Sequence, residues 1–231
     1  MIHRICPPAV RIVETITDVP GVVLFPEEEA AIASSVDKRR REFTTVRWCA
    51  RAALAELGVR PAPLVPGVRG APSWPDGIVG SMTHCDGLRA AAVASRRDVL
   101  TLGIDAEPDA ALPDGVLGVV ALPCEVEVLP RRGPVSWDRL LFCAKEAVYK
   151  AWFPLARRFL GFDEATVTID ESGTFTAQLL VAGPRVGEAE LTGFTGQWIA
   201  ADGLLAAAVV VPASRCPPKQ GGDRHREQPN D

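Results

Sequence analysis

The N-terminal part of the chain shows first a strand-like and then a helical pattern of apolar residues. Residues 11–16 predict a short strand, and Pro26 followed by three glutamates predicts a helix start. We expect helix to continue, with a break near residues 34–35, as far as Gly58, a residue typical of helix ends. Its core-facing stripe recurs at helical spacing and consists of Phe43, Val46, Ala50, Leu54 and Leu57.

The middle of the chain alternates between irregular segments and short apolar runs. Residues 61–75 are rich in proline and glycine and predict an irregular connection. Apolar runs bounded by turn residues predict strands at 78–82, 89–94 and 99–104. A variable segment that contains several prolines follows from 108 to 134.

The C-terminal part predicts one long helix and then several strands. Ser136 is placed to cap a helix over residues 137–153, which Pro154 ends. Strand patterns follow at 165–170, 174–181, 190–194, 197–201 and 204–211. Residues 214–231 are rich in proline, glycine and charge, so we expect a disordered tail.

Composition limits the classes of protein that this chain can be. With 231 residues and 47 % hydrophobic content, it predicts a packed globular protein of one large domain or two small halves. The net charge of −4 provides no general attraction to nucleic acid or anionic membranes, and no apolar run is long enough to span a bilayer. Six cysteines without a C-x-x-C pair, and no export signal, favour reduced thiols in the cytoplasm.

Two acidic residues follow the apolar strand that ends at Ile104. Asp105 and Glu107 are two positions apart, so on a strand their side chains project to the same face. Paired carboxylates suit Mg²⁺, which shares its remaining positions among water and phosphate oxygens. Isolated D-x-E triplets are common, so a pair of solvated acids is the alternative.

The helix over residues 137–153 carries a second acidic and basic group. Glu146 and Lys150 are one turn apart on a face next to the buried seam of Leu141, Ala144 and Val148. Alone, this spacing is also that of an ordinary helix-stabilising ion pair.

A third candidate site lies between two apolar segments, at residues 80–87 (G-S-M-T-H-C-D-G). Hydroxyls, backbone amides and the imidazole of His84 in one turn could bind phosphate oxygens. His84 could equally be a structural histidine. A Cys–His dyad with Cys85 is disfavoured because adjacent residues of an extended segment point to opposite sides.

Basic residues gather in the first long helix, at 38–41 and at Arg47 and Arg51. Guanidinium groups bind phosphate in a bidentate manner, so the cluster could hold a polyphosphate ligand. A solvated helix face is the alternative. Helical spacing alone places Arg40 beside Arg47 and Arg51, along the edge of the apolar stripe.

Taken together, these motifs resemble the Sfp-type 4′-phosphopantetheinyl transferases, in the branch with mycobacterial and enterobactin-type members. The resemblance covers about residues 36–211. It is carried by R-R-x-E-F-x-x-x-R-x-x-A-R ending at Arg51, W-P at 74–75, G-S-M-T-H-C at 80–85, G-I-D-A-E-P at 103–108, and W-D-R-L-L-F-C-A-K-E-A-V-Y-K-A-W-F-P at 137–154. The joint occurrence of G-I-D-x-E and F-x-x-K-E-A-x-Y-K is specific, although each motif alone is not.

The resemblance implies roles for particular residues. Mg²⁺, with Mn²⁺ as an alternative, would be held by Asp105, Glu107 and Glu146 together with the coenzyme A (CoA) pyrophosphate. Glu146, directly or through water, would be the base, and Lys145 and Lys150 would lie near the phosphates. The residues implied in CoA binding are Arg39, Arg47, Arg51, Arg69, Thr83, His84, Asp105, Lys145 and Lys150. Many relatives have a basic residue in a G-K-x-P context, where this chain has Gly-Ala-Pro at 70–72, so Arg69 is the candidate for that contact.

The resemblance also implies an α+β fold of two pseudosymmetric halves, each a small antiparallel sheet packed with a long helix. We place the N-terminal, nucleotide-binding half at residues 1–103 and the half with the metal and the catalytic helix at 104–213. The implied activity is transfer of 4′-phosphopantetheine from CoA to a serine of an apo acyl or peptidyl carrier protein, by a monomer in the cytoplasm. The alternatives are a non-catalytic module of the same fold that binds carrier proteins or CoA, and, more distantly, a nucleotide phosphohydrolase.

Overall fold

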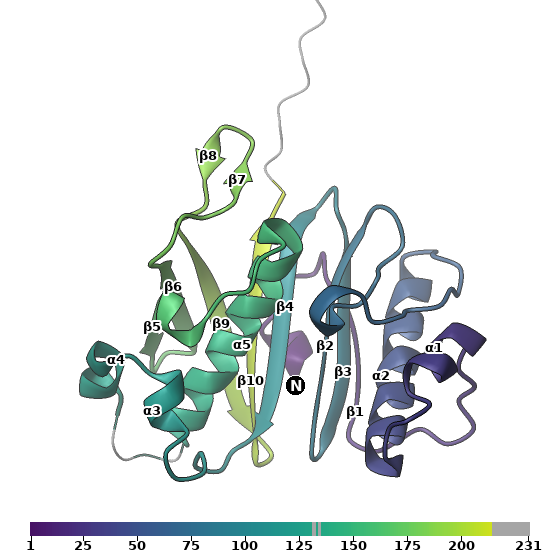
Figure 1. Cartoon of the computed structure of the whole chain (residues 1–231), viewed down its shortest axis with the longest axis horizontal. Helices are drawn as coiled ribbons and strands as arrows, with labels where there is room; N and C mark the ends of the chain where they lie inside the picture. Colours follow the sequence, from purple (N-terminus) through teal and green to yellow (C-terminus); the bar gives the residue numbers. More distant parts are fainter. Residues whose placement is uncertain (131–132, 134, 214–231) are drawn as a thin grey trace, which may run out of the picture.

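The chain folds into two antiparallel sheets, each covered by a 20-residue helix (Figure 1). The computed structural model describes residues 1–130, 133 and 135–213. The tail expected at 214–231 lies outside the described residues. The α+β class expected from the sequence is confirmed.

The N-terminal half contains the three-stranded sheet, in the order β1-β3-β2, with α2 packed on one face. Between α2 and the sheet lies a small core that includes Cys49, Leu54, Leu64 and Val93. The elements of this half are η1 Ile2–Arg4, β1 Arg11–Thr15, α1 Pro26–Ala31, α2 Asp37–Glu56, η2 Val68–Gly70, β2 Ile78–Cys85 and β3 Leu88–Ser95. The helix break expected near residues 34–35 is confirmed by the gap between α1 and α2.

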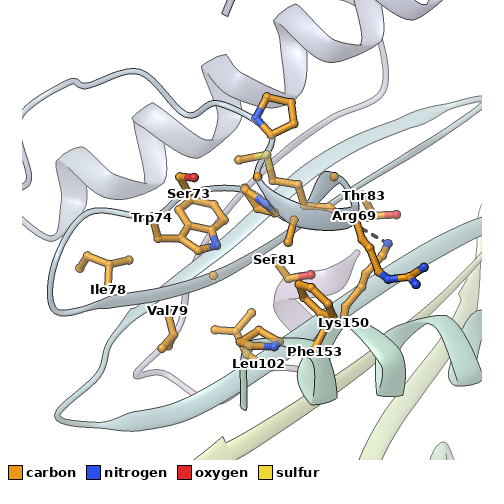
Figure 2. Close-up of a pocket in the computed structure, with 18 of the residues that line it drawn as sticks. Arg69, Ser73, Trp74, Ile78, Val79, Ser81, Thr83, Leu102, Lys150 and Phe153 are labelled. Carbon is orange, nitrogen blue, oxygen red and sulfur yellow. Dashed lines mark hydrogen bonds between the residues drawn. The ribbon is translucent and has the colours of Figure 1, made fainter. Parts of the chain in front are cut away.

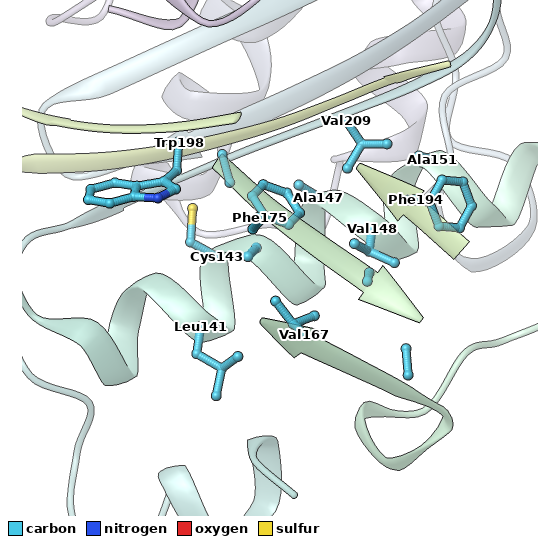
Figure 3. Packing of buried hydrophobic residues seen from close by; sticks show 14 of the residues in the cluster. Leu141, Cys143, Ala147, Val148, Ala151, Val167, Phe175, Phe194, Trp198 and Val209 are labelled. Atoms are coloured by element: carbon cyan, nitrogen blue, oxygen red, sulfur yellow. The ribbon is translucent and has the colours of Figure 1, made fainter. Parts of the chain in front are cut away.

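The C-terminal half contains the five-stranded sheet, in the order β4-β10-β9-β6-β5. Helix α5 packs on it around a core that contains Leu141, Ala147, Val167 and Phe175 (Figure 3). The elements are β4 Val99–Pro108, α3 Leu117–Val120, α4 Pro123–Val128, α5 Trp137–Ala156, η3 Phe162–Glu164, β5 Ala165–Asp170, β6 Thr174–Leu179, β7 Arg185–Val186, β8 Ala189–Glu190, β9 Gly193–Ala201 and β10 Leu204–Pro212. No helix in the described ranges is long and apolar enough to cross a membrane.

The two sheets meet where β2 lies beside β4 (Figure 1). A core of apolar residues from both sheets, including Ala92, Ile104 and Ala208, spans this junction together with Ile2. Strand β4 pairs with β10 from Val99 onward, so the boundary expected at 103/104 falls inside this strand. The chain passes from one sheet to the other in the turn at residues 96–98.

Three local expectations were wrong. Residues 80–85 do not form a turn, because β2 continues to Cys85 and the hairpin closes at Asp86–Gly87, with Gly87 at φ 86°. The strands expected at 190–194 and 197–201 are mostly one strand, β9, in which Gly196 leaves room for the Phe175 ring.

The third concerns α5, where Pro154 does not end the helix and Ser136 makes no capping hydrogen bond with its side chain. Pro154 lies in the last turn, where it removes one N–H donor of the helix without ending it. The helix ends at Arg157, a left-handed residue at φ 52° whose N–H donates to the Phe153 carbonyl at 2.9 Å.

Candidate functional site

A cavity of about 960 Å³ lies where the two halves meet, between α2, β2, α5 and the loop at 66–77 (Figure 2). Its volume is in the range of pockets that hold cofactors. The loop is held by Trp74, whose ring packs on Gly80 so closely that a Cβ there would lie 2.6 Å from it. Eight residues expected from the sequence line the cavity: Arg39, Arg47, Arg69, Thr83, His84, Asp105, Glu146 and Lys150.

Side-chain hydroxyls connect β2 to β4 beside this cavity. Ser81 Oγ accepts the Ile104 N–H at 3.1 Å, and Thr83 Oγ1 accepts the Ala106 N–H at 3.2 Å. Both hydroxyls are buried. They therefore take the place of the carbonyl groups of a neighbouring strand, and we call this contact the hydroxyl seam.

Asp105 stands at the hydroxyl seam with its two carboxylate oxygens in different surroundings. Oδ1 accepts hydrogen bonds from Lys150 Nζ at 2.6 Å and from Thr83 Oγ1 at 3.1 Å. Oδ2 is buried and has no hydrogen-bond partner in the described protein. A buried charged oxygen without a partner is costly, so this position favours a cation.

Lys150 reaches Asp105 because α5 lies directly against β4. A Cβ on Gly103 would overlap the Ala147 carbonyl oxygen, so only glycine permits this approach. The Lys150 ammonium also donates to the Met82 and Ile104 carbonyls at 3.4 and 3.2 Å, which ties it to both strands. Burial alone would lower the pKa of Lys150, but the Asp105 charge and hydrogen bond raise it, so Lys150 is charged.

Two further carboxylates lie near Asp105. Burial raises the pKa of Glu146, against the effect of Lys150, and the Asp105 charge raises it further. Burial and Asp105 also raise the pKa of Glu107, whose Oε2 accepts a hydrogen bond from Arg139 at 3.0 Å. Among the residues that the structure describes, no three His, Cys, Asp or Glu side chains come close enough together to hold one metal ion.

The donor set nevertheless fits Mg²⁺. This cation is usually bound by one or two carboxylates and completes its coordination with water and substrate phosphates. Asp105, with its unpartnered Oδ2, and Glu146 both line the cavity. Glu107 does not line it and is held by Arg139, a partner that the sequence analysis did not assign.

Basic groups line the cavity on the α2 side. Arg39 forms a hydrogen bond with His84 Nε2, and Glu42 lies 3.4 Å from His84 Nδ1. Burial and the Arg39 charge lower the pKa of His84, so its imidazole is neutral at pH 7. Arg47 lies over the Phe43 ring at 3.4 Å, and burial lowers its pKa to about 10. This end of the cavity is therefore suited to an anion.

Two arginines of the same helix point elsewhere. Arg40 forms an ion pair with Glu29 at 2.8 Å, and Arg51 forms one with the buried Glu28 at 2.9 Å. Neither lines the cavity, so the structure does not support the CoA contact expected of Arg51. Of the adjacent pair at 39 and 40, Arg39 is the one that faces the site.

Lys145 is also turned away from the large cavity. Its buried ammonium forms an ion pair with Glu125 at 2.7 Å and donates to the Phe162 carbonyl at 2.7 Å. It lines a small neighbouring pocket of about 110 Å³, together with Glu146 and Tyr149. The structure therefore does not bring Lys145 to the expected phosphate site, because the ammonium is already neutralised inside the C-terminal half.

Comparison with known proteins identifies the family. The chain is 59 % identical over 201 residues to the 4′-phosphopantetheinyl transferase Svp of Streptomyces mobaraensis, which covers 85 % of this chain and 82 % of Svp. The chain belongs to the 4′-phosphopantetheinyl transferases. Residues 27–94 match the 4′-phosphopantetheinyl transferase N-terminal domain and residues 101–201 match the 4′-phosphopantetheinyl transferase superfamily.

Two further transferases of the family are similar over most of their length. The chain is 49 % identical over 205 residues to PptT of Mycobacterium tuberculosis, with 86 % of this chain and 90 % of PptT covered. It is also 49 % identical over 219 residues to Npt of Nocardia iowensis, with 90 % and 99 % covered. The resemblance inferred from the motifs is thus confirmed, and the protein is a 4′-phosphopantetheinyl transferase.

Proposed function

We propose that this transferase moves 4′-phosphopantetheine from CoA to a serine of an apo acyl or peptidyl carrier protein, with Mg²⁺ bound at Asp105. The serine oxygen forms a bond to the β-phosphorus of CoA, the pyrophosphate P–O bond breaks, and 3′,5′-ADP leaves. The observation that carries the metal assignment is Asp105, which lines the large cavity together with Glu146 and has a buried carboxylate oxygen, Oδ2, without a hydrogen-bond partner among the described residues. Asp105 and Glu146 would hold the ion, and Glu107 would join them on leaving Arg139.

Each side chain at the cavity has a role in this proposal. Glu146 takes the proton of the serine hydroxyl, and burial raises its pKa, which makes the carboxylate a stronger base. Lys150 adds a fixed positive charge where negative charge accumulates. Arg39 and Arg47 bind the 3′-phosphate end of CoA, while Arg69 and His84 face the same cavity. When bound, Mg²⁺ supplies charge neutralisation of the pyrophosphate.

The structure also bears on the oligomeric state and the cellular compartment of the enzyme. One chain supplies residues from both halves to the cavity, which supports action as a monomer. Cys6, Cys49, Cys85, Cys124 and Cys143 are all free thiols, which supports a reducing compartment, the cytoplasm.

The proposal is tested by mass spectrometry of an apo carrier protein after incubation with the enzyme, CoA and Mg²⁺. We expect the carrier to gain the mass of one phosphopantetheine, and we expect no gain with EDTA or with Asp105→Asn. Carrier or CoA binding without a change in mass would favour the non-catalytic alternative. Release of 3′,5′-ADP without any carrier would favour a phosphohydrolase.

A further inference from the structure

Glu28, in α1, is a fully buried carboxylate that does not line the cavity. Its Oε1 accepts hydrogen bonds from the Leu64 N–H and from Arg51 Nη1, both at 2.9 Å. Its Oε2 accepts the same Arg51 group at 2.9 Å and the Phe25 N–H at 3.0 Å. A buried carboxylate is costly unless it is paired and hydrogen-bonded, and these contacts meet both needs. Glu28 therefore ties α1 to α2 and to the loop that contains Leu64.

Leu64 connects this carboxylate to Arg47. Its N–H donates to Glu28, and its carbonyl accepts a hydrogen bond from Arg47 Nε at 3.2 Å. The Phe43 ring lies 3.4 Å from the Arg47 guanidinium, which is thus held at Nε and on one face. Arg47 makes no other hydrogen bond within the described ranges and lines the cavity, so its terminal N–H groups are available to an anion.

Glu28 also supports the positive charge of Arg47. Burial is the main reason that the pKa of Arg47 is lowered to about 10, and the Glu28 charge opposes this effect. The charges of Arg39 and Arg51 act in the same direction as burial. Like charges that gather on one helix repel each other, so the buried Glu28 carboxylate offsets part of the cost of this arginine cluster.

We propose that Glu28 is a positioning residue for the 3′-phosphate end of the CoA site: it holds Leu64, whose carbonyl aims Arg47 into the cavity. This inference rests on the proposed function, because it requires Arg47 to bind the 3′-phosphate. It also gives Arg51 a role without a ligand contact, as the partner that neutralises Glu28 in the interior. Displacement of a binding group by a short distance weakens its effect strongly, so a change at Glu28 should alter CoA affinity.

The experiment measures binding of CoA and of dephospho-CoA, which lacks the 3′-phosphate, to the full-length enzyme by titration calorimetry. We expect Glu28→Met to weaken CoA binding about tenfold and dephospho-CoA binding by less than about twofold. Glu29→Met is the matched control on the same helix, because Glu29 is half-exposed and pairs with Arg40 outside the cavity. It should leave both affinities at the wild-type value.

A second variant keeps the test decisive if Glu28→Met does not fold. Glu28→Met with Arg51→Met replaces the whole buried ion pair with apolar side chains, a change that is often neutral for stability. It removes the acceptor for the Leu64 N–H just as the single variant does, so the same selective loss of CoA affinity is expected.

Combination with Arg47→Gln shows whether Glu28 acts through Arg47. Once Arg47 is gone there is no guanidinium left to position, so adding Glu28→Met to Arg47→Gln should weaken CoA binding by less than about twofold further. A general structural effect of Glu28 would instead weaken binding of both ligands equally and add to the effect of Arg47→Gln.

Three results would overturn the inference: wild-type CoA affinity in Glu28→Met, equal losses for CoA and dephospho-CoA, or a full additional loss in the Arg47→Gln background. A full additional loss in the variant that also carries Arg51→Met would indicate a direct contact of Arg51 with CoA. Failure of the proposed function itself looks different, because the wild-type enzyme would then bind CoA no more tightly than dephospho-CoA and would not modify a carrier protein.

Discussion

Arg39 and Arg40 are neighbours in sequence but lie in different surroundings, which allows a clean test of the anion site. We expect Arg39→Gln to weaken CoA binding at least about tenfold, because a charge-assisted contact to phosphate is lost. Dephospho-CoA, which lacks the 3′-phosphate, should lose much less affinity. Arg40→Gln should leave both affinities unchanged, since Arg40 is paired with Glu29 outside the cavity. Calorimetry with both ligands measures this, and equal losses for the two ligands in Arg39→Gln would contradict the assignment.

We expect substitution of Glu146 to reduce turnover much more than the stability of the fold. Glutamine keeps the volume and helix propensity of the residue, so Glu146→Gln should stay folded and bind CoA. It removes the carboxylate proposed as metal ligand and proton acceptor, so turnover should fall about 100-fold or more. Steady-state kinetics at rising Mg²⁺ and Mn²⁺ separates the two roles.

Recovery of the rate at high metal would mean that Glu146 serves only as a ligand. A low rate at saturating metal, without the acidic limb of the pH profile, would identify it as the base as well. Near-normal turnover at ordinary Mg²⁺ would remove both roles.

The identity of most site residues could be predicted from motifs, but their orientation could not. Lys145 and Lys150 are five residues apart, about 140° around a helix, so one α5 face cannot present both. That signal was present in the sequence. The partner of Lys145, Glu125, lies on a short helix in a segment with no recognisable pattern, and only the tertiary structure brings the two together.

At the scale of elements, the Lys145–Glu125 pair connects α4 to α5 inside the C-terminal half. Lys145→Met leaves the Glu125 charge buried without its partner and should lower the free energy of unfolding by about 3–5 kcal/mol. Adding Glu125→Gln removes that charge but keeps only one oxygen, so one of the two backbone N–H groups bonded by Glu125, Leu122 at Oε2 and Val167 at Oε1, loses its acceptor. Stability should therefore return only in part. Urea unfolding of the two single variants and the double variant measures the coupling.

CoA binding by the same variants shows whether Lys145 has a structural role or contacts the ligand. If Lys145 acts only through Glu125, the double variant should bind CoA about as well as wild type. Restored stability with CoA affinity still lost would instead return Lys145 to the phosphate site expected from the family.

The contact between β4 and α5 depends on Gly103. A methyl group there would overlap the backbone of α5, so Gly103→Ala should destabilise the protein by about 1–3 kcal/mol or more and should also reduce turnover, because Lys150 moves away from Asp105. Gly118→Ala in α3 is the matched control, since nothing lies within 4 Å of the added Cβ. Thermal unfolding and turnover measure both effects, and equal behaviour of the two variants would contradict this account.

Element types could largely be read from the sequence, whereas several ends could not. Residues 81–84 looked like a break because serine, threonine and histidine are polar, yet the structure buries the two hydroxyls by pairing them with amides of β4. Hydropathy cannot distinguish a polar group that is exposed from one that is satisfied internally. Pro154 was expected to end α5, but the helix continues to Ala156, and nothing in the sequence pattern marks that continuation.

At the scale of the whole molecule, the clustered carboxylates make stability depend on pH. The pKa values of Glu107 and Glu146 are raised in the folded protein, so the folded state binds protons more tightly than the unfolded chain does. This contribution is present at low pH and is lost as pH rises above the usual glutamate value of 4.5 and through the raised pKa values. Bound Mg²⁺ should offset the loss.

We therefore expect the gain in melting temperature from Mg²⁺ with CoA, relative to EDTA with CoA, to grow as the pH rises above the usual glutamate value of 4.5 and through the raised pKa values of these groups. Scanning calorimetry at a series of pH values measures it. Glu107→Gln with Glu146→Gln should flatten the curve. A gain independent of pH in the wild type would show that neither carboxylate is coupled to the metal.

The single crossing between the two sheets, in the turn at 96–98, also makes the enzyme modular. The arginines at the anion end of the cavity and the carboxylates proposed to hold the metal are encoded by separate, contiguous stretches of the gene, which the two family domains match in turn. A chimera of two relatives joined at this turn would have a functional site only if a few residues from one parent are compatible with a few from the other. These are Ser81 and Thr83 in one parent and Gly103, Asp105 and Lys150 in the other. Recombination between members of the family is thus constrained by one strip of hydroxyl, carboxylate and ammonium groups rather than by the whole interface.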